Sequence, residues 1–182
     1  ALLGVRTPCS VIPNGIDTTL YSRSCDPRAL LTLGIREEHR VILFMGRIHP
    51  VKGADLLLEA FIECHARQPS AVLVLAGPDE FGLERKFRER ATLAGLRDKV
   101  VFPGMVSGQV KRDLLARANV FCLPSVAEGF SMAVLEALAS GTAVLLSAGC
   151  NFPEVEVAGA GRVCERTPRA IAASLELMLS DG

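Results

Sequence analysis

Short apolar runs alternate with longer segments of helical periodicity along most of the chain, and this alternation limits the possible folds strongly. The runs cover residues 41–45, 71–76, 99–103, 119–124 and 142–147, and the helical segments cover about residues 54–67, 83–95, 108–118, 131–140 and 168–180. Strands that are apolar throughout belong in a sheet covered on both faces. Strands that alternate with helices imply right-handed crossovers between parallel strands. The sequence therefore predicts a single α/β domain over residues 1–182, with a doubly wound parallel sheet.

Before the first run, "VIPNGID" (11–17) predicts a strand end with a turn at Asn14-Gly15.

Composition excludes several classes of protein. The 182 residues include 20 Lys+Arg and 20 Asp+Glu, and this zero net charge disfavours a general nucleic-acid binder. No apolar run approaches the roughly 20 residues of a membrane span, and no secretory signal opens the chain. We expect a cytoplasmic domain, and the missing initial Met leaves open that the sequence is a piece of a longer protein.

The cysteines favour buried thiols in a reducing compartment over a disulfide framework. They stand at positions 9, 25, 64, 122, 150 and 164, with no C-x-x-C pair. Zinc needs clustered ligands, and none is visible in the sequence. We therefore predict no metal site.

The loop "GRIHPVKG" (46–53) follows the first apolar run, at an edge where parallel sheets bind ligands. Gly46 allows a sharp turn. Arg47 and Lys52 place two cations near a helix N-terminus, a combination suited to a diphosphate. Two solvated loop charges are the alternative. The loop matches neither Walker A nor G-x-G-x-x-G, so a nicotinamide cofactor is unsupported. A lone loop histidine such as His49 is more often simply exposed.

The stretch "EGFSMAVLEALASG" (128–141) places two acids around the start of an apolar helix. Ser131 is a suitable N-cap, so the amides of Met132 and Ala133 are among the free donors that can bind an anion. Helical rotation would leave Glu128 and Glu136 roughly 80° apart, so both could line one side of a cleft. Glu136 stands among apolar residues, and a charge there needs a partner or a ligand. Ordinary helix-terminal and solvent-facing glutamates are the alternative.

These segments, in this order, resemble the C-terminal, donor-binding half of retaining GT-B glycosyltransferases of group 1, family 4. The resemblance covers nearly all of the chain and rests on "IPNGID", "GRIHPVKGADLLLEAF", "LVLAGPDE", "VVFPGMVS" and "NVFCLPSVAEGFSMAVLEALASG". The last segment contains the family's E-x7-E signature. The resemblance implies a Rossmann-like domain that binds a nucleotide-sugar.

The resemblance also implies roles for individual residues. Arg47 and Lys52, beside Gly46, would hold the donor's diphosphate, and Glu128 would contact the transferred sugar. Glu136 would bind the ribose. Main-chain groups would contact the sugar and phosphate from Gly129, Phe130, Ser131, Met132 and Ala133, and the base from Gly104, Met105 and Val106. Two segments depart from the family's commonest pattern: Ser131 replaces a frequent glycine, and "AGCNFPEV" keeps an acid at Glu154 but differs at residues 150–152.

The implied reaction is transfer of a sugar with retention at the anomeric carbon. Its central difficulty is the negative charge on the departing diphosphate, which cations and amides can stabilise. The chain has no D-x-D triad, so we expect Arg47 and Lys52 to act without a metal, and Glu128 to position the sugar rather than act as a nucleophile.

The implied donor is a UDP-, GDP- or ADP-sugar. The implied acceptor, a saccharide or a lipid-linked glycan, would bind mainly to an N-terminal domain absent from this chain, so the isolated domain should bind nucleotide but be inactive. Peripheral contact of the full enzyme with the inner membrane face stays open. The alternatives are a non-catalytic nucleotide-sugar-binding module and another GT-B activity such as an epimerase. A phosphorylase would need a lysine for pyridoxal phosphate, and Lys86, Lys99 and Lys111 stand in unpromising places.

Overall fold

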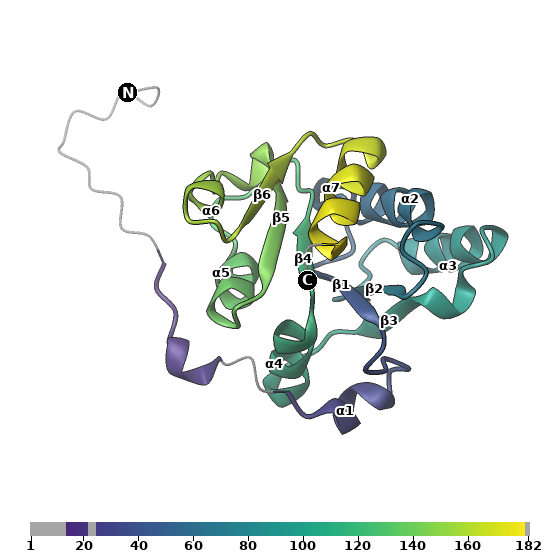
Figure 1. The fold of residues 1–182 in the computed structure, drawn as a ribbon, viewed down its shortest axis with the longest axis horizontal. Helices are drawn as coiled ribbons and strands as arrows, with labels where there is room; N and C mark the ends of the chain where they lie inside the picture. Colours follow the sequence, from purple (N-terminus) through teal and green to yellow (C-terminus); the bar gives the residue numbers. More distant parts are fainter. Residues whose placement is uncertain (1–13, 22–24, 181–182) are drawn as a thin grey trace.

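The computed structural model describes residues 14–21 and 25–180, which form one α/β domain built on a parallel sheet (Figure 1). The six strands are β1 (Arg40–Met45), β2 (Ala71–Ala76), β3 (Val100–Gly104), β4 (Val120–Leu123), β5 (Ala143–Ser147) and β6 (Gly161–Cys164). The helices are α1 (Pro27–Leu31), α2 (Ala54–His65), α3 (Leu83–Leu93), α4 (Gly108–Arg117), α5 (Met132–Ala139), α6 (Glu154–Val157) and α7 (Pro168–Ser180). The predicted doubly wound parallel sheet is confirmed.

The strand order is β3-β2-β1-β4-β5-β6, with every pairing parallel. The chain therefore winds outward from β1 to β3, then crosses back to β4 and winds outward in the other direction. Because the direction of winding reverses between β1 and β4, their carboxyl ends leave a crevice where such sheets bind ligands. The loops that follow these two strands, together with helix α5, contain most of the predicted site residues, whereas Met105 and Val106 follow β3.

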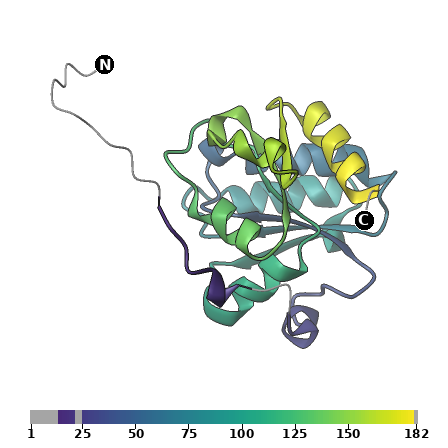
Figure 2. The same ribbon diagram turned by 60° about the vertical axis from the view of Figure 1, so that its left-hand side comes forward.

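Helices cover both faces of the sheet, which explains the uninterrupted apolar strands (Figures 1 and 2). Helices α2, α3 and α7 pack on one face, whereas α4 and α5 lie on the other. All residues of β2 are buried, and so are residues 41–45 of β1. The core continues into α2 through Phe61 and into β4 through Phe121.

Three short elements are missing from the sequence prediction. Strand β6 has four residues, including Gly161 and the exposed Arg162, and it lies at the sheet edge. An edge strand need not be apolar along its length, so a search for continuous apolar runs overlooks it. Helices α1 and α6 are only five and four residues long, too short to display helical periodicity. The predicted helix 54–67 ends earlier, at His65.

The start of the described chain only partly tests the prediction for residues 11–17. Residues 11–13 lie outside the described part, as does Cys9, and Asn14 to Asp17 form no strand. Asp17 instead caps the 3-10 turn η1 (Thr18–Leu20) by accepting a hydrogen bond from the amide of Thr19 at 3.0 Å.

The five described cysteines are free thiols, and Cys64, Cys122 and Cys150 are buried, in agreement with the prediction. Burial raises the pKa of Cys64 to about 11, so this thiol stays protonated at neutral pH. Among the described helices, none is both long and apolar enough to cross a membrane.

Candidate functional site

The loops that follow β1 and β4 are joined by direct hydrogen bonds. The carbonyl oxygen of Val51 accepts from the amide of Val126 at 2.8 Å and from the hydroxyl of Ser125 at 3.0 Å. His49 belongs to the same structure: its Nδ1 accepts from the amide of Val51 at 3.0 Å, and its ring packs edge-on against Phe81. His49 is therefore half-buried and supports the loop, rather than being simply exposed.

Gly53 permits an unusually close approach of these two loops. Its backbone is left-handed, with φ of 74°, and a Cβ atom at this position would lie 2.2 Å from the carbonyl oxygen of Pro124. Such a separation is far below van der Waals contact, so a side chain would push the loops apart. The glycine thus allows Lys52, its neighbour, to reach the loop that carries Glu128.

Lys52 and Glu128 form a bidentate ion pair. The Nζ atom of Lys52 lies 2.7 Å from Oε1 and 2.8 Å from Oε2 of Glu128. The side chains are 22% and 7% exposed, respectively. The amide of Glu128 also donates to the carbonyl oxygen of Gly149 at 2.8 Å, which anchors the loop to the segment after β5. The two residues predicted to contact phosphate and sugar therefore neutralise each other.

Arg47 has a different environment. Its Nη1 atom lies 3.2 Å from Oε2 of Glu80, in the loop after β2, and the side chains are 57% and 45% exposed. Sequence analysis did not identify Glu80 as a partner of Arg47. The segment "GPDE" between a strand and a helix was the available signal, because acids there face the same carboxyl edge of the sheet.

Helix α5 begins as predicted. Ser131 has extended backbone angles, and its hydroxyl accepts from the amide of Val134 at 3.4 Å. Ser131 itself is buried, while Met132 and Ala133 begin the helix at the cleft. Just before the cap, the rings of Phe130 and Phe152 pack with their centres 5.9 Å apart. The free amides of this helix start therefore lie at the predicted anion site.

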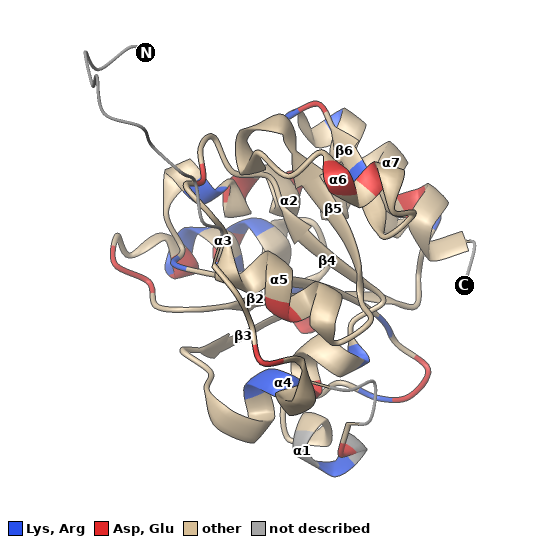
Figure 3. Ribbon diagram, turned by 90° about the vertical axis from the view of Figure 1, so that its left-hand side faces the viewer, with Lys and Arg blue, Asp and Glu red and all other residues tan. Residues whose placement is uncertain are grey.

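Glu136 is buried on α5, yet it has two donors. Its Oε1 atom accepts from Nζ of Lys111 at 2.6 Å and from the hydroxyl of Tyr21 at 3.0 Å. Burial raises the pKa of the Tyr21 phenol, and the bond to Glu136 raises it further, so Tyr21 keeps its proton at neutral pH. Figure 3 shows α4, with its basic residues in blue, beside the acidic segment of α5 in red.

Lys111 is a partner of Glu136 that sequence analysis did not identify. It lies three and four positions before the buried Leu114 and Leu115, and therefore on the same side of α4. That spacing was the signal that Lys111 faces the domain rather than the solvent. Tyr21 had no comparable signal, because its contact with Glu136 spans 115 positions of sequence.

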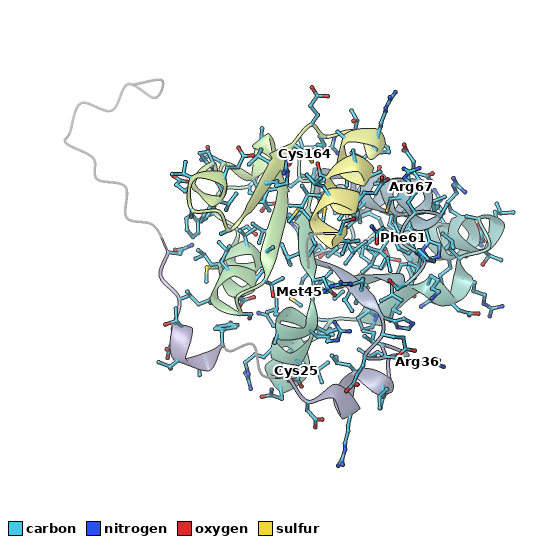
Figure 4. All side chains as sticks on the ribbon, viewed as in Figure 1. Cys25, Arg36, Met45, Phe61, Arg67 and Cys164 are labelled. Atoms are coloured by element: carbon cyan, nitrogen blue, oxygen red, sulfur yellow. The ribbon has the colours of Figure 1, made fainter. Side chains whose placement is uncertain are left out.

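A cleft of about 280 Å3 opens at the carboxyl edge of the sheet. It collects predicted site residues from three separate segments: Gly46, Arg47, Met105, Val106, Met132, Ala133 and Glu136 all line it. Lys111, from α4, lines it as well. Met45, at the end of β1 and labelled in Figure 4, forms part of its wall. Lys52, Glu128, Gly129, Phe130 and Ser131 are not among the lining residues, so Glu128 and Glu136 do not share one wall as the helical estimate predicted.

A larger hollow, of about 580 Å3, lies between α3 and the edge strand β3. Its lining includes Arg85, Arg88 and Phe102, but none of the predicted site residues. The smaller cleft is the candidate site, because it lies at the carboxyl edge of the sheet, where parallel sheets bind ligands, and is lined by predicted site residues. Among the described residues, no group of three or more His, Cys, Asp or Glu side chains is placed to hold a metal ion.

Comparison with known sequences now decides the family. The sequence model of the family described as "Glycosyl transferases group 1" matches residues 32–182. The chain belongs to this family. The predicted group 1 glycosyltransferase domain is confirmed.

Two curated relatives illustrate how far the similarity extends. This glycosyltransferase domain is 34% identical over 153 residues to an uncharacterised glycosyltransferase of Methanocaldococcus jannaschii, covering 82% of this chain and 38% of the relative. It is 34% identical over 140 residues to a D-inositol 3-phosphate glycosyltransferase of Rhodococcus opacus, covering 74% of this chain and 31% of the relative. The chain therefore spans about a third of the length of these relatives.

Solved structures show the same fold. The C-terminal domain of LpcC, a group 1 family protein from Francisella tularensis, matches with a TM-score of 0.80 at 24% identity, covering 92% of this chain and 89% of that domain. HepE from Anabaena, in complex with UDP and glucose, matches with a TM-score of 0.81 at 24% identity, covering 94% of this chain and 47% of HepE. The glycosyltransferase domain therefore has the α/β fold of a GT-B C-terminal domain, as predicted.

Proposed function

We propose that this group 1 glycosyltransferase domain binds a nucleotide-diphospho-sugar and supplies the donor side of a retaining glycosyl transfer. The observation that carries the proposal is the cleft at the carboxyl edge of the sheet, where Arg47, Glu136 and the start of α5 come together. Cations and free helix amides match a diphosphate, and carboxylates match the hydroxyls of sugars.

The diphosphate would lie against Arg47, Lys52 and the amides at residues 130–133. As the bond between the anomeric carbon and the diphosphate breaks, negative charge gathers on the leaving phosphate. Groups already placed for that charge stabilise the transition state more than the bound substrate. We therefore assign transition-state stabilisation to Arg47 and Lys52, without a metal ion.

The remaining contacts would orient the donor. Glu128 would accept from hydroxyls of the transferred sugar once the incoming phosphate draws Lys52 away from it. Glu136 would accept from the ribose, and the main chain of Met105 and Val106 would lie against the base. Both glutamates are then positioning groups, and retention follows from an acceptor that attacks on the face from which the diphosphate leaves.

The nature of the donor is supported by one of the structural matches. HepE was crystallised in complex with UDP and glucose, and we extend a nucleoside diphosphate, without choosing its base, to this domain. The acceptor would bind mainly to another domain of the complete enzyme, which would work in the cytoplasm or at the inner membrane face. The chain alone should then bind nucleotide and turn over poorly.

Calorimetric titration with UDP, GDP and ADP tests the proposal. At least one nucleotide should bind the unmodified chain, and Arg47→Ala, Lys52→Ala and Glu136→Ala should each weaken it by about tenfold to a hundredfold, the usual effect of losing a charge-assisted hydrogen bond. Arg85→Ala is the matched control, because it removes a charge from a well-exposed side chain of α3 outside the cleft. Unchanged affinity in all three site variants would contradict the assignment.

A further inference from the structure

The two oxygens of the Glu136 carboxylate are held unequally. Oε1 accepts hydrogen bonds from both Lys111 and Tyr21, at 2.6 and 3.0 Å. Among the described residues, no donor contacts Oε2. One oxygen is therefore occupied by the protein itself, while the other keeps its capacity to accept a hydrogen bond.

This arrangement is built from three separate parts of the chain. Glu136 comes from α5 and Lys111 from α4, whereas Tyr21 belongs to the segment that follows η1. The Glu136 side chain is 11% exposed and that of Lys111 is 27% exposed. A carboxylate so shielded from water needs compensating donors, and here the donors approach a single oxygen from two elements.

Two donors on one oxygen also fix the orientation of the carboxylate. The terminal torsion of a glutamate is broad and only weakly restricted by itself. Anchoring Oε1 to two elements removes that freedom before any ligand arrives. A site that is ordered in advance loses less conformational entropy when it binds.

We propose that Tyr21 and Lys111 are positioning residues for Glu136: they hold its Oε1 atom and leave Oε2 to accept a ribose hydroxyl of the donor. This inference rests on the proposed function, in which Glu136 contacts the ribose. Lys111 lines the same cleft as Glu136, so its contribution lies where the nucleotide would bind. Neither residue needs to contact the reacting atoms.

The test compares a nucleoside diphosphate with its 2′,3′-dideoxy analogue, because only the first can donate a ribose hydroxyl to Glu136. The nucleotide is whichever of UDP, GDP and ADP binds the full chain most tightly. The unmodified chain should prefer the ribose form by about tenfold or more. Lys111→Met and Tyr21→Phe should each lower this preference for the ribose form by about threefold, since each removes a single donor to Glu136.

The affinity for the dideoxy analogue distinguishes positioning from general damage. Both variants should lose less affinity for the analogue than for the ribose form, because the analogue offers Glu136 no ribose hydroxyl. Arg85→Met is the matched control: it removes a charge from a well-exposed side chain of α3 outside the cleft, so the ribose preference should stay unchanged. Lys111→Arg, which keeps a charged donor, should restore part of the preference.

Other outcomes would overturn the inference. Equal loss of affinity for both ligands would assign Tyr21 and Lys111 to folding or to phosphate contact. A gain in ribose affinity for Lys111→Met would mean that the lysine competes with the ligand. If the unmodified chain bound nucleotide without preferring ribose, the role of Glu136 would fail while the diphosphate site stood. Absence of all nucleotide binding would overturn the proposed function and this inference together.

Discussion

The sequence predicts that Lys52 and Arg47 both contact the diphosphate, and in the structure each forms an ion pair with a glutamate. The two pairs differ in the number of contacts and in their exposure to water. Lys52 donates to both carboxylate oxygens of Glu128, and the side chains of Lys52 and Glu128 are 22% and 7% exposed. Arg47 makes one contact with Glu80, and both side chains are about half exposed. The sequence motif treats Arg47 and Lys52 as equals, whereas the structure places one inside the loop framework and the other at its rim.

The difference shows how the two cations would meet a ligand. Breaking a shielded ion pair leaves an uncompensated charge, which costs several kcal/mol. An exposed pair contributes about 0–1 kcal/mol. A diphosphate must therefore offer Lys52 an interaction as strong as its ion pair with Glu128. The sugar must likewise offer Glu128 hydrogen bonds as strong as those it loses from Lys52. Arg47 can leave Glu80 at little cost.

Removing Lys52 should have the largest effect. Lys52→Ala leaves the shielded carboxylate of Glu128 without its ion-pair partner. We therefore expect the free energy of unfolding, measured by urea denaturation, to fall by about 3 kcal/mol. The paired variant Lys52→Met with Glu128→Gln removes both charges and should recover most of that loss without recovering nucleotide binding. A Lys52→Ala variant as stable as the unmodified chain would show that the inner pair is no stronger than the outer one.

The second prediction concerns the close approach that brings the inner pair together. Gly53→Ala should lower the free energy of unfolding by about 2 kcal/mol, since it combines a left-handed backbone with a collision against the carbonyl of Pro124. Gly82→Ala is a matched control: Gly82 also precedes a helix with left-handed angles, but a Cβ there would meet nothing within 4 Å. We expect about 1 kcal/mol for the control. Equal losses would mean that the loops tolerate the extra atom.

The fold was predictable because its signals are local and repeated. Continuous apolar runs such as residues 71–76 identify strands buried on both faces, and the alternation with helices fixes their parallel direction. Because ligands bind at the carboxyl edge of such sheets, the sequence also predicts that Arg47 and Glu136 lie at one site, and both line the cleft. Strand β6 escaped prediction because it lies at an edge and includes the exposed Arg162, so it lacks the apolar continuity on which the prediction depends.

The partners of the site residues were not predictable in the same way. Glu136 needs a partner because its charge stands in an apolar helix, but the sequence does not identify the residue that pairs with it. Lys111 reaches it only because α4 packs beside α5, and Tyr21 only because the segment after η1 approaches α5. Such contacts depend on how elements pack in three dimensions, and a single sequence carries little of that information. The pairing of Lys52 with Glu128 likewise follows from the close approach at Gly53.

The smallest predicted effect tests the outer pair directly. Glu80→Gln keeps the shape of the side chain and releases Arg47, so the free energy of unfolding should change by less than about 0.5 kcal/mol. Nucleotide affinity should rise by about twofold to threefold at low salt, because Arg47 no longer divides its charge between Glu80 and the diphosphate. At high salt the gain should shrink, since exposed charges are screened.

A double-mutant cycle identifies the source of that gain. In an Arg47→Ala background, Glu80→Gln should change the affinity less than it does when Arg47 is present, because the residue it releases is absent. An equal gain in both backgrounds would mean that Glu80 acts only by repelling the diphosphate. A fall in stability comparable to that of Lys52→Ala would contradict the distinction between the two pairs, because it would show that the exposed contact of Arg47 supports the fold as strongly as the shielded contact of Lys52.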